Sequence, residues 1–174
     1  MRSYSRLLVK IAMLGMLFPF CSMAADITIN VSGKVVASPC TIDNSGIYNI
    51  DLGQNILAAT LKQANSYSLW KVFNITLSNC PSGTTKVTAT FSGTADGNNS
   101  TMYANATGTG YAQNVAIQLQ NSAAGTNVGN GSTMTVDVEN SNATFPLHAR
   151  VYSAKGGGTP GNITASVMLN MSYN

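Results

Sequence analysis

The stretch Gly161-Asn162-Ile163-Thr164-Ala165-Ser166-Val167-Met168-Leu169-Asn170-Met171-Ser172-Tyr173-Asn174 decides the fold class. Every odd position from Ile163 to Tyr173 is apolar or aromatic, and the even positions are polar except Met168. Successive side chains of a β-strand point to opposite faces, so a period of two places all the odd residues on one face. The stretch therefore predicts one long strand over residues 163–173 with one buried face.

Alternation of the same kind recurs upstream, between clusters of Gly, Asn, Ser and Pro. The alternating segments are residues 47–52, 72–77, 85–91, 115–119, 133–138 and 145–151. Long helical periodicity is scarce, and residues 56–64, which have some helical character, are expected to form a loop with at most a short turn. Many short strands separated by turn residues are typical of an all-β sandwich or barrel.

The N-terminus carries a targeting pattern. Three basic residues in the first ten positions precede an uncharged apolar run at residues 11–20, and small residues follow up to Ala24. This pattern predicts a signal peptide over residues 1–24, cleaved after Ala24. The apolar run is shorter than the roughly 20 residues that span a bilayer. Cys21 raises lipid attachment as an alternative, but Pro19-Phe20 before it does not match the small-residue box that lipidation requires.

The charge balance argues against a nucleic-acid partner. The chain has nine Lys and Arg and six Asp and Glu, and three of the basic residues lie in the predicted signal peptide. The mature chain is then formally neutral, with no basic patch of the kind that binds phosphate backbones. A near-neutral surface gives little repulsion between copies, which suits a protein that associates with itself.

Two cysteines, Cys40 and Cys80, remain after the predicted cleavage. In an exported chain they predict one disulfide, with a pair of buried free thiols as the alternative. Closing a loop of about 40 residues would stabilise the fold by roughly 4 kcal/mol in the chain-entropy model.

The start of the mature chain also alternates. Ile27, Ile29 and Val31 point one way and their polar neighbours point the other, up to Gly33. Glycine permits a change of chain direction at that point. The periodicity leaves two structures open: residues 25–32 are either a projecting arm or the first strand of the body.

Chemistry-bearing residues are few. The one histidine, His148, falls on the polar side of its segment, and the close acidic pair Asp137 and Glu139 is expected to lie on a solvated edge. The sequence has no Gly-x-Ser-x-Gly elbow, no cluster of metal-ligating residues, and no phosphate loop at residues 156–158. We therefore predict no catalytic residues, no metal and no cofactor, and a protein that is not an enzyme.

Several motifs keep a recognisable order and spacing along the whole mature chain. They are the start at residues 25–36, Pro39-Cys40-Thr41 followed by Ile50-Asp51-Leu52-Gly53, Leu77-Ser78-Asn79-Cys80-Pro81, Phe91-Ser92-Gly93-Thr94-Ala95-Asp96, and the segments 112–119 and 145–150. At the end, Gly161 is the fourteenth residue from the C-terminus and Tyr173 is the penultimate one. This combination resembles the pilin subunits of chaperone–usher pili, most closely the minor tip subunits of type 1 pili.

The resemblance implies an all-β fold, an incomplete immunoglobulin-like sandwich lacking its last strand, formed by residues 34–174 and preceded by a donor-strand extension at residues 25–33. The implied donor residues are Ala25, Ile27, Ile29 and Val31. The implied strand beside the acceptor groove contributes Gly161, Ile163, Ala165, Val167, Leu169, Met171 and Tyr173.

The resemblance also implies partners and a location. Neighbouring pilin subunits would bind head-to-tail, and a periplasmic chaperone, holding the carboxylate of Asn174 with basic residues, would precede them in the groove. An outer-membrane usher and a tip adhesin complete the expected partners. The chain would be exported through the periplasm to the cell surface as part of a fimbrium. The expected role is a minor tip adaptor; the alternatives are a major rod pilin or, less favoured, a carbohydrate-binding adhesin module.

Overall fold

The computed structural model describes residues 28–174, and the chain divides into two units, Met1–Lys34 and Val35–Asn174. The predicted signal peptide and the predicted donor residues Ala25 and Ile27 lie outside the described residues. Residues 28–34 form neither helix nor strand. Within them, the side chains of Ile29 and Val31 are 80% and 90% exposed.

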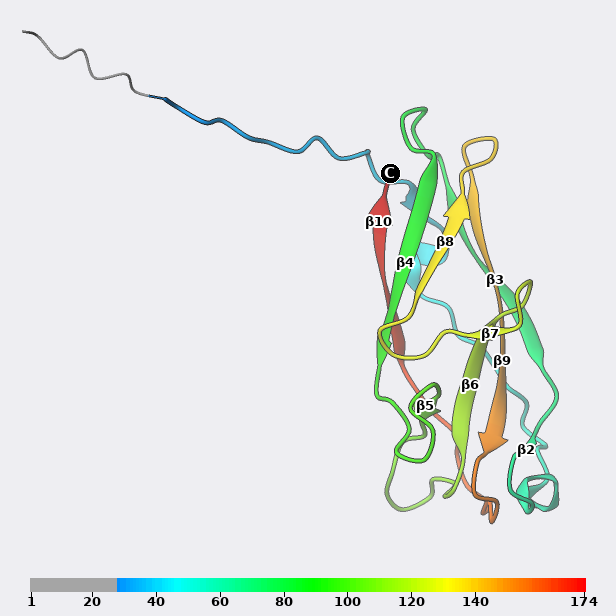
Figure 1. Cartoon of the computed structure of the whole chain (residues 1–174). Helices are drawn as coiled ribbons and strands as arrows, with labels where there is room; N and C mark the ends of the chain where they lie inside the picture. The colour runs from blue at the N-terminus through cyan, green and yellow to red at the C-terminus, as the bar shows by residue number, and fades with distance from the viewer. Residues whose placement is uncertain (1–27) are drawn as a thin grey trace, which may run out of the picture. The chain divides into compact units, whose positions relative to one another are not determined.

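The second unit consists almost entirely of strands and loops (Figure 1). Its elements are β1 (Thr41–Ile42), the 3-10 helices η1 (Asp43–Gly46) and η2 (Ala58–Leu61), β2 (Ser66–Tyr67), β3 (Lys71–Ser78), β4 (Lys86–Gly93), β5 (Tyr103–Ala104), β6 (Ala116–Asn121), β7 (Thr126–Asn127), β8 (Thr133–Asp137), β9 (Ala143–Ser153) and β10 (Val167–Tyr173). The expectation of no more than a short turn within residues 56–64 is confirmed by η2.

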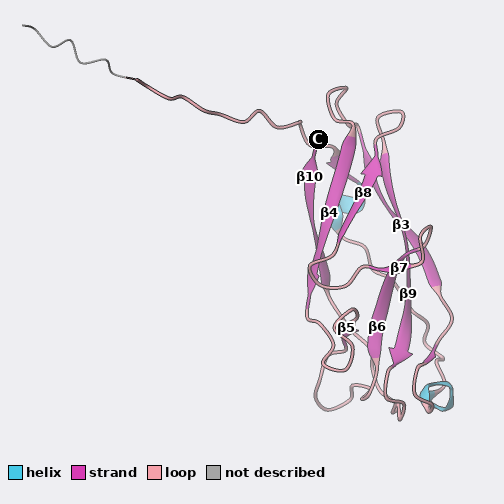
Figure 2. Ribbon diagram, in the orientation of Figure 1, coloured by secondary structure: helices cyan, strands magenta, loops and turns pink. Residues whose placement is uncertain are grey.

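The strands form two antiparallel sheets (Figure 2). The seven-stranded sheet has the order β1-β3-β9-β6-β5, with β2 also paired to β9 and β7 to β6. The three-stranded sheet has the order β10-β4-β8. The inward side chains of both sheets meet in one core, as in a sandwich. The predicted all-β, immunoglobulin-like class is confirmed.

The alternation of the sequence explains the core. Along β9, every second residue from Ala143 to Ser153 is buried and the residues between them are half-buried or exposed. The same period on β4 buries Val87, Ala89 and Phe91. Apolar area removed from water in this way stabilises the fold by about 25 cal/mol per Å². The predicted disulfide is also present: buried Cys40, just before β1, is bonded to buried Cys80, just after β3.

Two predicted strands differ from the structure. Residues 47–52 were predicted as a strand and form none, although Tyr48, Ile50 and Leu52 remain half-buried and their neighbours are exposed. The predicted strand 163–173 is shortened to β10. Thr164 explains the shortening, because its N–H donates to Asn105 Oδ1 at 2.7 Å and its carbonyl accepts from the N–H of Ala106 at 2.9 Å. Loop residues thus take the hydrogen bonds that a strand partner would need.

Candidate functional site: a groove beside the C-terminal strand

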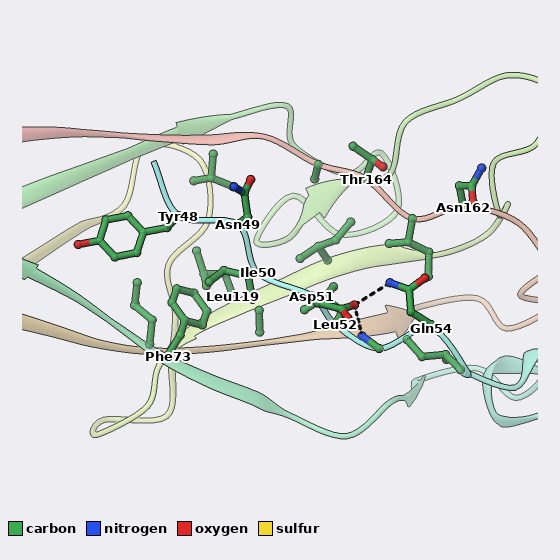
Figure 3. Close-up of a pocket in the computed structure, with 18 of the residues that line it drawn as sticks. Tyr48, Asn49, Ile50, Asp51, Leu52, Gln54, Phe73, Leu119, Asn162 and Thr164 are labelled. Atoms are coloured by element: carbon green, nitrogen blue, oxygen red, sulfur yellow. Dashed lines mark hydrogen bonds between the residues drawn. The ribbon is translucent and has the colours of Figure 1, made fainter. Parts of the chain in front are cut away.

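A groove of about 710 Å³ runs between β10 and the segment before η2. One wall is formed by residues 48–56 and the other by residues 161–169. The floor comes from the inward faces of β3, β6 and β9. The floor residues are Phe73, Ile75, Ile117, Leu119, Leu147 and Ala149. Figure 3 shows Phe73 and Leu119 among the side chains that line the groove.

Beside the groove, β10 has an open edge. Its residues pair with β4 in one continuous register, from Val167 opposite Gly93 to Tyr173 opposite Val87. In the part of the chain that the structure describes, no strand pairs with its other edge. A row of backbone N–H and C=O groups on such an edge is a template for pairing with another strand.

The side chains of β10 show what is missing. Val167, Leu169, Met171 and Tyr173 are only half-buried, although they pack on the core, and the residues between them are exposed. Burial raises the pKa of the Tyr173 phenol from its ordinary value. An apolar face that stays half open to water loses part of the stabilisation that a closed core supplies. The predicted buried face is therefore present but incompletely covered.

The opposite wall is held by side chains and not by a strand ladder. The Tyr48 hydroxyl lies 3.3 Å from both the backbone N–H and the carbonyl of Thr76 in β3. Asp51 accepts hydrogen bonds from the N–H of Gly53 and from Gln54 Nε2, both at 2.9 Å (Figure 3). These bonds, that of Gly53 first, lower the pKa of the Asp51 carboxyl from its ordinary value.

Gly161 closes one end of the β10 wall. It has φ +151°, and a Cβ atom there would lie 2.3 Å from the backbone nitrogen of Ala112. The close approach aligns Asn162, whose carbonyl accepts a 3.0 Å hydrogen bond from the N–H of Ala112. Only glycine fits such a backbone contact. At the other end, the carbonyl of Asn174 accepts hydrogen bonds from the N–H groups of Thr85 (2.6 Å) and Lys86 (3.0 Å).

The structure places the predicted acceptor residues unevenly. Five of them line the groove, namely Gly161, Ile163, Ala165, Val167 and Leu169. Met171 and Tyr173 lie farther along β10 against the core and do not line it. Sequence reasoning missed the wall at residues 48–56 as a part of the site. The alternation at residues 47–52 was the signal that could have predicted this wall. An apolar face of that kind is expected to pack against the core even where the segment forms no strand.

Residues 28–174 contain no group of three or more His, Cys, Asp or Glu side chains able to hold a metal ion. The same residues include no helix that is both long and apolar enough to cross a membrane.

Comparison with known proteins shows the family of the chain. The family described as fimbrial protein matches residues 29–174. The chain belongs to this family. Protein FimG of Escherichia coli K12 is 42% identical over 152 residues, which cover 86% of each chain. The S-fimbrial adhesin protein SfaS of Escherichia coli O6:K15:H31 is 39% identical and covers 88% of this chain and 89% of its own.

A solved structure shows the same architecture. The crystal structure of the P pilus rod subunit PapA aligns with a TM-score of 0.64 and 26% identity, covering 79% of this chain and all of the other. The predicted membership in the chaperone–usher pilin family is confirmed. The chain is a structural subunit of fimbriae at the cell surface, and its family is not enzymatic.

Proposed function

We propose that this fimbrial subunit polymerises by donor-strand exchange. The groove beside β10 accepts an N-terminal arm, residues 25–33, from a neighbouring subunit, and the arm of this chain enters the groove of the next. The observation that carries the proposal is a pair of incomplete features in one chain. A 710 Å³ groove with an apolar floor lies beside the open edge of β10, and an extended segment exposes Ile29 and Val31 almost fully.

The two features complement each other physically. A strand inserted beside β10 adds main-chain hydrogen bonds along the open edge, and its alternate side chains fill the space above the floor. Ile27, Ile29 and Val31 have the spacing of two that this insertion requires. Each such side chain contributes roughly 1.5–3 kcal/mol when fully buried, before ordering costs. Because donor and acceptor lie at different places on one chain, the association is head-to-tail and builds a fibre.

The same groove explains why helper proteins are expected. A subunit with an open groove beside an unpaired strand edge is prone to aggregate, because the edge is a template for pairing with other chains. We therefore infer that a periplasmic chaperone covers the groove and that the outer-membrane usher mediates the exchange. The carbonyl of Asn174 already accepts backbone hydrogen bonds within the chain, so the predicted chaperone contact with this terminus would use the second carboxylate oxygen.

The role that we favour is a minor tip adaptor between an adhesin or another subunit and the rod. Two observations support it. The arm and the Ala25-Asp26-Ile27-Thr28-Ile29 start resemble minor tip subunits, and sequence identity is 42% with protein FimG but 28% with LpfA of Escherichia coli O157:H7, a probable major fimbrial subunit. A rod pilin remains the alternative, and quantitative immunolabelling of whole fimbriae separates the two. Label confined to tips supports the adaptor, and label along the shaft supports the rod.

The exchange itself is tested with the exported chain and a variant lacking residues 25–32, each produced with and without the cognate chaperone. Size exclusion and unboiled gel mobility report assembly. We expect the full chain to form a heat-sensitive ladder, and the deletion variant to bind chaperone and yet donate to no neighbour. If both forms are stable monomers without chaperone, the fold is complete by itself and the proposal is wrong.

A further inference from the structure

A column of stacked side chains stands on the outer face of the seven-stranded sheet, away from the groove floor. The guanidinium carbon of Arg150 lies 3.6 Å from the ring centre of Tyr67 and 4.1 Å from that of Trp70. The His148 ring stacks on Trp70 with a centroid distance of 3.8 Å and an interplanar angle of 9°. Tyr152, opposite Tyr67 in the strand register, stacks at 6.4 Å from it.

Arg150 is held in this column as a fixed cation. Its Nε donates a 2.7 Å hydrogen bond to Gln118 Oε1, and the rings of Tyr67 and Trp70 restrict the guanidinium plane. Across residues 28–174 the structure shows one ion pair, between Lys86 and Asp137, so no described carboxylate neutralises Arg150. A guanidinium already ordered by its neighbours loses little conformational entropy when it binds a ligand.

The side chain of Arg150 is partly removed from water. Burial lowers the pKa of Arg150 from its ordinary value, although the hydroxyls of Tyr67 and Tyr152 oppose the shift. An anion at the outer edge of the guanidinium would compensate this lost hydration. The planar fork of an arginine matches the two oxygens of a carboxylate.

Neutral hydrogen-bonding groups surround the cation on the same face. Gln118 and Gln120 both donate to Asn127 Oδ1, at 3.0 and 2.8 Å, and Asn127 donates to Thr101 Oγ1 at 2.9 Å. Gln120 also shares a 3.0 Å hydrogen bond with His148 Nε2. An amide nitrogen carries two N–H groups, so Gln120 and Asn127 each retain one beyond these bonds. Fixed amides of this kind pair with hydroxyl groups.

The column also offers an apolar surface. The Tyr67 side chain is 51% exposed although one ring face covers Arg150. Aromatic rings beside polar groups suit ligands that combine C–H faces with hydroxyls. Protein side chains would use the cation and the ring, but a sugar acid uses the cation, the ring and the amides together.

We propose that this outer face binds a sugar that carries a carboxylate. The fork of Arg150 receives the carboxylate, the exposed ring of Tyr67 contacts the C–H face of the sugar, and the amides of Gln120 and Asn127 donate to hydroxyl groups. The site lies outside the groove, so it adds a ligand-binding function to a subunit whose assembly uses the other face of the sheet.

The test titrates the exported chain, in the complex or fibre in which it purifies, with four probes followed by saturation-transfer NMR and calorimetry. The probes are glucuronic acid, N-acetylneuraminic acid, galactose and acetate. We expect at least one sugar acid to bind ten- to a hundredfold more tightly than galactose and acetate, since a charge-assisted bidentate contact and a ring contact both contribute. Equal binding of all four probes, or no binding of either sugar acid, overturns the proposal.

Three variants localise the binding. Arg150→Lys keeps the charge but not the fork, and we expect about a tenfold loss of affinity for the sugar acid. Tyr67→Ala removes a half-exposed ring, and we expect a similar loss of affinity for the sugar acid. Because the ring is not part of the buried core, this variant should still fold. Lys155→Gln removes an exposed charge beyond the end of β9 and is the matched control with unchanged affinity. Unchanged affinity in both Arg150→Lys and Tyr67→Ala contradicts the assignment.

Discussion

Gly161 approaches Ala112 so closely that a Cβ atom on the glycine would lie 2.3 Å from the backbone nitrogen of Ala112. This contact fixes where the chain enters the wall of the groove, just before Ile163. The left-handed φ of +151° at Gly161 adds a conformational requirement to the steric one.

We expect Gly161→Ala to destabilise the fold by at least about 1–3 kcal/mol, through the backbone strain and the clash together. Urea unfolding of the chain in its chaperone complex or fibre measures the loss. Gly131→Ala is the matched control, because Gly131 also has a positive φ, +82°, but open space around its Cβ position. Equal losses in the two variants would show that the contact with Ala112 contributes nothing.

Tyr103 gives a prediction at alkaline pH. Its buried hydroxyl donates a 2.9 Å hydrogen bond to the carbonyl of Val128, and burial raises its pKa to about 12. Since the ordinary value is about 10, this group contributes stability that is complete below pH 10 and is lost as the pH rises toward 12. Ultraviolet titration should show a tyrosine ionising near pH 12 in the folded chain.

The matching variant is Tyr103→Phe, which should lose the late ionisation. It also leaves the Val128 carbonyl without its donor, at a cost of about 1–3 kcal/mol. A titration curve identical to that of the unchanged chain would contradict the assignment to Tyr103.

His148 gives a prediction at acidic pH. Burial and, second, the charge of Arg150 lower the pKa of His148 below its ordinary value of about 6.5. A depressed folded-state pKa stabilises the fold above the unfolded value and loses that contribution as the pH falls through the folded one. NMR titration is unambiguous because the chain has one histidine. A midpoint at or above 6.5 would contradict the burial of the His148 ring beside the charge of Arg150.

The Cys40–Cys80 bond spans 40 residues. Chain-entropy reasoning assigns it roughly 4 kcal/mol, and we expect reduction to lower the urea midpoint of the chain accordingly. The double variant Cys40→Ala/Cys80→Ala should behave like the reduced chain. If the reduced chain keeps the same urea midpoint, the disulfide does not stabilise the fold. Other contacts would then restrict the segment before β1 in the unfolded ensemble.

Much of the architecture was predictable from the period of two. The inward faces of β3, β4, β8 and β9 follow from alternation alone, because a half-buried strand must alternate. Family resemblance then supplied the missing strand, which no periodicity can reveal. The ends of the elements were not predictable: Thr164 leaves the predicted strand because Asn105 and Ala106, distant in sequence, bind its backbone.

The site was predictable on one wall only. The C-terminal alternation indicated β10. The other wall, residues 48–56, forms no strand, and Tyr48 is anchored to Thr76 through its side chain, a contact that no sequence pattern predicts. The stacked column on the outer face was also hidden. Tyr67 and Trp70 belong to one short segment and Arg150 lies far from it in sequence, so only the pairing of β2 and β3 with β9 brings the three together.

The most direct test of the assembly account is amide hydrogen exchange of β10 in the variant lacking residues 25–32, held with its chaperone and then given a synthetic peptide of residues 25–33. Insertion of the peptide should release the chaperone and leave the outward amides of Val167–Tyr173 protected, because the peptide backbone pairs with the open edge. A peptide with Ile29→Asp should fail to do so. Unchanged exchange along β10, or equal protection by both peptides, would contradict donor-strand exchange at this groove.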